Sequence, residues 1–171
     1  MGGRCVFVIG MESSGSKLLA KILSHALGIQ AYGTWNGSGW SRSFESPHRV
    51  CHRSQPYGRD SRFSDIRRWN EENRDLAIHY VVCTRDVTIS ERSRLARWPE
   101  RRGSFVDQTG RAREIIREVL ETCDHTIWSY ETFMLMGGDY LRWLYRSLGV
   151  DSDFIPADIA DGNAKHVRRA A

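Results

Sequence analysis

A turn rich in glycine and hydroxyl groups lies near the start of the chain, where residues 10–17 read Gly-Met-Glu-Ser-Ser-Gly-Ser-Lys. An apolar run over 5–9 precedes this turn, and leucine, isoleucine and alanine follow at helical spacing over 18–27. A strand that passes through such a turn into a helix leaves several backbone N–H groups unpaired at the positive end of the helix dipole. The turn therefore predicts a site for a phosphate or a sulfate group.

The spacing of two glycines in this turn matches that of a nucleoside-triphosphate loop. In that loop, Gly-x-x-x-x-Gly is followed by lysine and then by a serine or threonine that binds magnesium. Gly10 and Gly15 have the required separation, but Ser16 stands at the lysine position and Leu18 follows Lys17. No hydroxyl group therefore follows the lysine to bind magnesium.

The middle of the turn, Ser-Gly-Ser followed by Leu-Leu, resembles the 5′-phosphosulfate loop of the sulfotransferase family. Ser13 stands where that family usually has a basic residue, and Lys17 is placed to supply a cation from the other side. The resemblance implies that this loop binds the sulfate donor 3′-phosphoadenosine-5′-phosphosulfate (PAPS). The residues that it implicates are Ser13, Ser14, Gly15, Ser16, Lys17 and Leu18.

Sulfotransferases share a second signature, an arginine at the end of a later strand and a serine eight residues on, which bind the 3′-phosphate of PAPS. Arg85 follows the apolar segment 77–84, and Ser93 lies eight residues after it. An arginine suits this role because its planar fork forms two parallel charge-assisted hydrogen bonds with a phosphate. Ser90 is the competing serine, because Arg85-Asp86 also resembles a pair that precedes the family's serine by four residues.

The resemblance further implies a general base, which in this family is a histidine or a glutamate near the second strand. His52 ends the predicted second strand and is our first candidate, and His48 is the second. A hydrogen-bonded structural histidine at a strand end is the alternative for His52. Arg53 is placed to contact the sulfonate instead, and Glu12 is a further candidate base or a partner that braces Lys17.

Three later segments extend the resemblance over nearly the whole chain. The sequence 129–131, Ser-Tyr-Glu, resembles a Tyr-Glu pair that follows a core strand in many sulfotransferases, although its glutamate is equally suited to cap a helix. The segment 161–166 is too polar to pack, yet the resemblance implies that it folds over the nucleotide and that Lys165 contacts the donor. Trp35 and Trp40, in the glycine-rich loop 32–47, are interpreted as part of the acceptor pocket.

Strand-like and helix-like patterns alternate along the chain. Strands are predicted over 5–9, 49–52, 78–84 and 126–130, and helices over 18–27, 60–73, 86–98, 107–123 and 138–148. Such alternation predicts a single α/β domain over residues 1–171, with a parallel sheet of four to five strands between helices on both faces. This architecture is a three-layer α/β/α sandwich of the P-loop NTPase-like kind, with ligands at the carboxyl ends of the strands.

Composition limits the class of partner. With 25 Lys and Arg against 21 Asp and Glu, the net charge of +4 suits an anionic ligand and is too small to indicate nucleic-acid binding. The four cysteines lack metal-ligand spacing and are expected to be reduced thiols. Because no apolar run approaches the roughly 20 residues of a membrane span, we expect a soluble cytoplasmic protein, monomeric or dimeric, without a membrane partner.

These features predict a sulfotransferase that moves a sulfuryl group from PAPS to a hydroxyl, or an amine, of a small-molecule or carbohydrate acceptor. No metal is required for this chemistry, because positioning and charge stabilisation supply most of the catalysis. Two alternatives remain open. One is a P-loop kinase of small molecules that uses ATP and magnesium, and the other is a nucleotide-binding module without catalytic activity.

Overall fold

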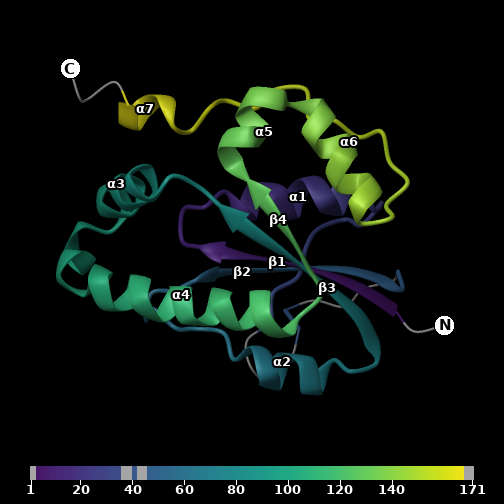
Figure 1. Ribbon diagram of the computed structural model, residues 1–171, viewed down its shortest axis with the longest axis horizontal. Coiled ribbons are helices and arrows are strands. Elements are labelled where there is room, and N and C mark those ends of the chain that lie inside the picture. Colours follow the sequence, from purple (N-terminus) through teal and green to yellow (C-terminus); the bar gives the residue numbers. More distant parts are fainter. Residues whose placement is uncertain (1–2, 36–39, 42–45, 168–171) are drawn as a thin grey trace.

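The computed structural model describes residues 3–35, 40–41 and 46–167, without the side chains of residues 165 and 167. Its centre is a sheet of four parallel strands in the order β2-β1-β3-β4 (Figure 1). The strands are β1 (Gly3–Met11), β2 (His48–Gln55), β3 (Leu76–Thr84) and β4 (His125–Ser129). Phe7 of β1 pairs with Cys51 of β2 on one side and with Tyr80 of β3 on the other.

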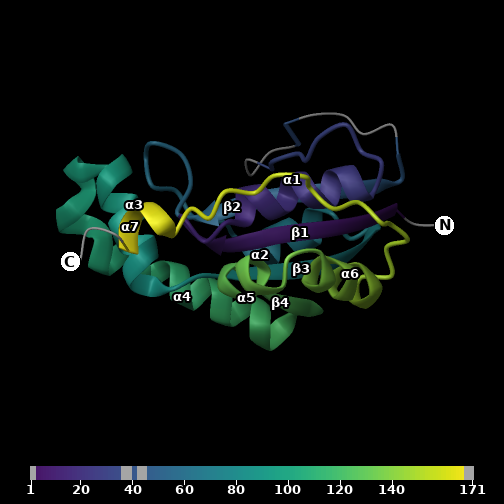
Figure 2. The ribbon, with the colours of Figure 1, turned by 90° about the horizontal axis from the view of Figure 1, so that it is seen from above.

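Helices cover both faces of the sheet, as the alternating pattern predicts (Figures 1 and 2). One face packs against α1 (Ser16–Ala26), α5 (Tyr130–Met136) and α6 (Gly138–Ser147), and the other against α2 (Ile66–Glu72) and α4 (Phe105–Thr122). The helix α3 (Val87–Arg97) and the 3-10 helix η1 (Pro99–Ser104) lie beyond the carboxyl ends of the central strands. The prediction of an α/β fold with a parallel sheet of four strands is confirmed.

The side chains of β1 alternate between the two layers of the core. Val6 and Val8 pack in the layer that contains α1, whereas Phe7 and Ile9 pack in the layer that contains α2 and α4. All four are buried, because a central parallel strand is covered on both faces. This burial fixes the register of β1 and with it the position of the turn that follows.

The predicted element boundaries are accurate within a few residues, with two exceptions. The helix predicted over 60–73 forms only over Ile66–Glu72, because the carboxylate of Asp65 accepts from the backbone N–H of Arg68 and caps the helix there. After β4, the separate helix α5 begins at Tyr130, and its cap is Ser129 rather than Glu131. The described part of the chain contains no helix long and apolar enough to cross a membrane.

Trp35 and Trp40, interpreted from the sequence as part of the acceptor pocket, both pack against α2 in the structure. Trp35 is buried in the core, and both indole rings pack edge-on against Trp69 of α2, with centroid separations of 5.4 and 4.9 Å. Large aromatic rings gain most from burial, and the core layer that contains α2 and α4 accommodates them beside α2. Residues 36–39 and 42–45 of the same loop lie outside the described residues.

The carboxy-terminal segment after α6 crosses the α1 layer and ends in α7 (Ala164–Val167), close to α3 (Figure 2). Phe154 anchors this crossing, because its ring stacks on His25 of α1 and its carbonyl accepts from the hydroxyl of Tyr145. The segment therefore reaches the carboxyl ends of the strands. The expectation that residues 161–166 are too polar to pack is wrong for Gly162 and Asn163, which form hydrogen bonds there.

Candidate functional site

The turn between β1 and α1 is too tight for side chains at either of its glycines. A Cβ atom at Gly10 would lie 2.7 Å from the carbonyl oxygen of Cys83. Gly15 has a φ of +87°, and a Cβ there would lie 2.7 Å from the ring of Tyr130. Ser13 also has a positive φ, of +71°. The two glycines therefore allow the turn to pass close to β3 and α5 and to adopt its left-handed residues.

The first turn of α1 follows directly after this loop, and Ser16 and Lys17 of that turn line a cavity. Gly15 occupies the N-cap position, and within the described residues no side chain caps the helix. The backbone N–H groups of the first helical residues have no partner within the helix, and the helix dipole places partial positive charge at the same point. This end of α1 can therefore bind an anion through backbone groups alone.

A cavity of about 540 Å³ opens over this helix end and collects most of the residues that the sequence implicated. Those that line it come from the loop, from β2 and its continuation, and from the segment after β3. We call it the loop cavity, and the predicted residues that line it are Glu12, Ser13, Gly15, Ser16, Lys17, His52, Arg53, Arg85 and Ser93.

His52 contacts the loop directly. Its Nε2 lies 3.1 Å from the hydroxyl oxygen of Ser16, and the edge of its ring faces Tyr32. Burial, together with the positive charges of Arg53 and Lys17, lowers the pKa of His52 to about 4. The imidazole is therefore neutral near pH 7, and one ring nitrogen carries a lone pair that can accept a proton.

Arg85 joins the loop to the carboxy-terminal segment. Its Nη1 donates to the carbonyl of Ser13 at 2.8 Å, and its Nε donates to Oδ1 of Asn163 at 2.7 Å. The guanidinium lies over the ring of Tyr130, with its carbon 4.6 Å from the ring centroid. Its Nη2 is buried and has no hydrogen-bond partner among the described residues. A buried unpaired donor of this kind is costly unless a ligand accepts its hydrogen bond.

The structure separates the two candidate serines of α3. Ser93 is half-buried and lines the loop cavity together with Arg85. Ser90, three residues earlier, is buried and faces a different cavity between α3 and α4. The geometry therefore favours Ser93 over Ser90 as the partner of Arg85 at an anion.

Several predicted residues lie away from this cavity. His48 is exposed at the first position of β2, where it pairs with Arg4, so it lies at the amino end of the sheet. Ser14 is buried beneath the loop, and Leu18 packs against the α1 layer of the core. None of these three residues lines the loop cavity, so their side chains are not part of the candidate site.

Lys165 lies in α7, and its side chain is outside the described part of the structure. The guanidinium of Arg53 donates through both Nε and Nη2 to the carbonyl of Trp35 and lies over the ring of Tyr57. Arg53 therefore holds the wall of the cavity in place while it contributes positive charge.

Glu12 does not brace Lys17. Its Oε1 accepts from the indole N–H of Trp98 at 3.0 Å, and its Oε2 lies 3.6 Å from Nε of Arg94. Arg94 is almost fully buried, so this pair neutralises a charge inside the protein. Since the carboxylate of Glu12 is engaged in this way, His52 is the better-placed base.

Sequence reasoning missed part of the cavity lining. Tyr32 and Thr34 reach it from the predicted acceptor loop, and Trp98 reaches it from the end of α3. Nothing in the sequence indicated that Asn163 and Glu131 act together with Arg85. Asn163 accepts a hydrogen bond from Arg85, and its side-chain amide donates to the carboxylate of Glu131, which positions it. Only the clustering of aromatic residues in the loop 32–47 signalled any of these contacts before the fold was known.

The charge around the loop cavity is strongly positive. Its lining contains one carboxylate, that of Glu12, which is paired with Arg94. The cationic residues that line it are Lys17, Arg53, Arg59, Arg85 and Arg97. A ligand with several negative charges is therefore favoured.

Comparison with known proteins gives no match to a family model, to a curated protein or to a solved structure. The class that the structure itself defines is an α/β protein with a four-stranded parallel sheet and helices on both faces. The features of the loop cavity therefore carry the functional interpretation by themselves.

Proposed function

We propose that this protein is a sulfotransferase that transfers a sulfuryl group from PAPS to a hydroxyl, or an amine, of a small-molecule or carbohydrate acceptor. The observation that carries the proposal is the convergence of the β1–α1 loop, Arg85 and His52 on one positively charged cavity. We also propose, as part of the same assignment, that the β1–α1 loop is related to the P-loop of nucleotide-binding proteins. The open carboxyl edge of the parallel sheet is where α/β folds bind such ligands.

The two ends of the donor have separate partners in this proposal. The N–H groups at the start of α1, with Ser16 and Lys17, bind the 5′-phosphosulfate. The unpaired Nη2 of Arg85 and the hydroxyl of Ser93 bind the 3′-phosphate. PAPS carries about four negative charges, and the five cations of the lining against one paired carboxylate suit that charge.

His52 serves as the general base. The acceptor oxygen forms a bond to sulfur while the bond between sulfur and the bridging oxygen of the 5′-phosphate breaks. The acceptor proton passes to the ring of His52, and the electrons of the broken bond remain on the 5′-phosphate, where Lys17 and the loop N–H groups stabilise the charge. An anion bound beside His52 raises its pKa, because opposite charge favours the protonated ring.

The direct test is binding of 3′,5′-adenosine bisphosphate, the product left by PAPS, measured by thermal shift and by calorimetric titration. A ligand that binds only the folded protein raises the melting temperature by mass action. We expect stabilisation by the bisphosphate in wild type, a large loss in Arg85→Ala, and no loss in Arg142→Ala, a surface control whose partner is Asp139.

A competing titration separates this proposal from a kinase. Stabilisation by ATP with magnesium, without any effect of the bisphosphate, would overturn the sulfotransferase assignment. Binding of the bisphosphate without consumption of PAPS in the presence of a panel of hydroxyl and amine acceptors would instead indicate a nucleotide-binding module. Formation of a sulfated product from PAPS would establish the activity.

A further inference from the structure

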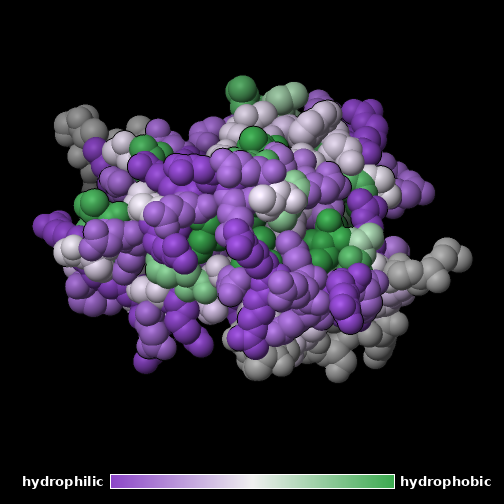
Figure 3. Space-filling view, turned by 60° about the horizontal axis from the view of Figure 1, so that its bottom comes forward, coloured by the Kyte–Doolittle hydropathy of each residue, from purple (hydrophilic) through white to green (hydrophobic). Residues whose placement is uncertain are grey.

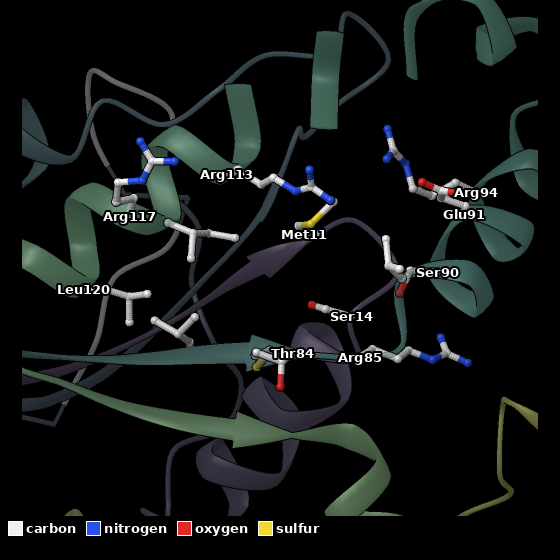
Figure 4. A pocket seen from close by; sticks show the side chains of 14 residues that line it. Met11, Ser14, Thr84, Arg85, Ser90, Glu91, Arg94, Arg113, Arg117 and Leu120 are labelled. Carbon is white, nitrogen blue, oxygen red and sulfur yellow. The ribbon is translucent and has the colours of Figure 1, made fainter. Parts of the chain in front are cut away.

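A second cavity, of about 330 Å³, lies on the other side of the β1–α1 loop, between α3 and α4. Its volume falls within the range of about 300 to 1,000 Å³ that small-molecule sites occupy. Figure 4 shows its walls, with Arg113 and Arg117 reaching from α4 on one side and Ser90, Glu91 and Arg94 lying on α3 opposite. We call it the α3–α4 cavity.

The loop and α3 lie between this cavity and the loop cavity, and Arg85 lines both. Ser13 and Ser16 face the loop cavity, whereas Ser14 lines the α3–α4 cavity. Helix α3 likewise presents Ser93 to one cavity and Ser90 to the other. The contact between Glu12 and Arg94 lies between them, so the two cavities can hold different molecules.

The interior of the α3–α4 cavity is largely apolar. Val82 of β3 and Ile116 of α4 form part of it, and Met11 lines it at the end of β1. At its mouth, Val87 and Leu120 remain 44% and 36% exposed, which is high for side chains of this kind. Figure 3 shows the face that carries α4, where small hydrophobic areas lie among hydrophilic side chains. An apolar group that enters the cavity covers this surface.

The polar groups of the cavity favour an anion. Arg113 and Arg117 lie one helical turn apart on α4, and neither forms an ion pair with any described residue. The facing acid is Glu91, whereas the charge of Arg94 is balanced by Glu12. Each of these guanidinium groups offers several donors to a carboxylate or sulfonate.

A buried hydroxyl points to a ligand independently. The side chain of Ser14 is 2% exposed and lines the cavity, and its Oγ has no hydrogen-bond partner among the described residues (Figure 4). Buried polar groups are nearly always hydrogen-bonded in folded proteins. A molecule in the cavity that carries an acceptor or donor group at this depth would satisfy it.

We propose that the α3–α4 cavity binds a small amphipathic anion, a molecule with an apolar body and a single carboxylate or sulfonate group. The apolar body lies against Val82 and Ile116, and the anionic group is held by Arg113 and Arg117 at the mouth. Arg85 lines both cavities, but the residues that carry this inference lie outside the proposed donor site, so its test is separate from that of the sulfotransferase proposal.

The test uses the full chain and the fluorescent probe 8-anilinonaphthalene-1-sulfonate, with decanoate as a non-fluorescent competitor. We expect saturable fluorescence with one probe molecule per chain and displacement by decanoate. Decyltrimethylammonium, which has the same apolar chain and the opposite charge, should displace the probe far less. The bisphosphate should leave the probe in place, because it occupies the loop cavity.

Two variants locate the probe. The double substitution Arg113→Gln and Arg117→Gln should weaken probe and decanoate binding by about tenfold or more, the effect of losing a charge-assisted hydrogen bond. Leu120→Asp, at an exposed position, should weaken it similarly through repulsion and lost apolar contact. Arg111→Gln, on the same helix but outside the cavity, is the matched control and should change nothing.

Several results would overturn the proposal. They are the absence of saturable binding, equal displacement by the cationic detergent, displacement by the bisphosphate, and unchanged affinity in both cavity variants. Melting curves of each variant exclude binding of the probe to partly unfolded protein. Retained cooperative melting together with lost probe affinity supports the site.

Discussion

The hydroxyl of Ser16, the first residue of α1, lies 3.1 Å from Nε2 of His52 in the neighbouring strand β2. This contact joins the end of the helix at which we propose that an anion binds to a neutral imidazole. Because Ser16 and His52 are 36 residues apart in the chain, the parallel pairing of β1 with β2 is what brings them together. The positions of a bound anion and of the proposed base are thus fixed by one feature of the sheet.

Replacing the proposed base should slow transfer without preventing donor binding. His52→Gln keeps a polar side chain of similar size and removes the proton acceptor. A general base contributes about 10² to 10⁴ in rate, so we expect kcat to fall by at least about 100-fold. The affinity for 3′,5′-adenosine bisphosphate, measured by calorimetry, should remain close to wild type. A loss of bisphosphate affinity as large as the loss of kcat would instead assign His52 to donor binding.

The stability of the free protein should fall in mild acid because of His52. Its pKa is lowered from an ordinary value near 6.5 to about 4 in the folded protein, so the unfolded chain takes up the proton first as pH falls. The free energy of unfolding should therefore drop between about pH 6.5 and pH 4, by roughly 3 kcal/mol for this group.

Urea unfolding of wild type and His52→Gln, near neutrality and at about pH 4.5, checks this prediction. The variant should lose less stability than wild type over the same interval, since it lacks the group that protonates on unfolding. Equal losses in the two proteins would show that the ring is not desolvated. The other histidines contribute to both proteins and cancel in the difference.

Asn163 should influence donor binding through Arg85. Asn163→Ala removes the acceptor of the Arg85 Nε hydrogen bond, and we expect bisphosphate affinity to fall about five- to tenfold, near 1 kcal/mol. Asn163→Asp keeps an acceptor, so its melting temperature should stay closer to wild type, but its negative charge should weaken bisphosphate binding further. If both variants bind the bisphosphate like wild type, the hydrogen bond between Arg85 and Asn163 has no role in the site.

The two serines of α3 should have different effects. Ser93→Ala removes a hydroxyl from the loop cavity and should weaken bisphosphate binding by about five- to tenfold, with little change in melting temperature. Ser90→Ala, a matched change one turn away, should leave that affinity unchanged because Ser90 faces the other cavity. Calorimetric titration of both variants measures the contrast, and a larger effect at Ser90 would reverse the assignment.

Gly15→Ala should destabilise the protein. The substitution places a Cβ 2.7 Å from the ring of Tyr130 and forces a left-handed conformation on alanine, so we expect a loss of about 1 to 3 kcal/mol. Gly28→Ala is the control, because Gly28 also has a positive φ but nothing lies within 4 Å of its Cβ position. The excess loss at Gly15 in urea unfolding measures the steric part, and equal losses would show that the loop relaxes.

Local patterns predicted most of the fold. The strand β1, the loop and α1 follow from an apolar run, two glycines and a helical repeat, each of which is a property of neighbouring residues. The helix α2 was predicted too long, because the capping carboxylate of Asp65 lies within a segment where Phe63, Ile66 and Trp69 continue the helical spacing of apolar residues.

The site was predicted less completely, for a physical reason. Ser16, Lys17 and Arg85 were predicted from the glycine-rich turn and from the resemblance of two motifs to those of sulfotransferases, and the carboxyl ends of parallel strands bring these motifs to one edge of the sheet. His48 and His52 could not be separated by type, and only the length of β2 places one at the amino end and the other near the loop. The side on which Ser14 points, and the contact of Asn163 with Arg85, depend on tertiary packing that no local pattern encodes.

The contacts of Arg85 span 72 residues back to Ser13 and 78 residues forward to Asn163. Such long-range contacts form only when the sheet and the crossing over α1 are both complete. Under the proposed function, affinity for 3′,5′-adenosine bisphosphate therefore also reports cooperative folding, since a partly folded chain lacks one of the three segments that Arg85 joins. Titration of the bisphosphate at a series of denaturant concentrations would measure how these three segments come together. Circular dichroism at the same concentrations would measure the loss of helix separately.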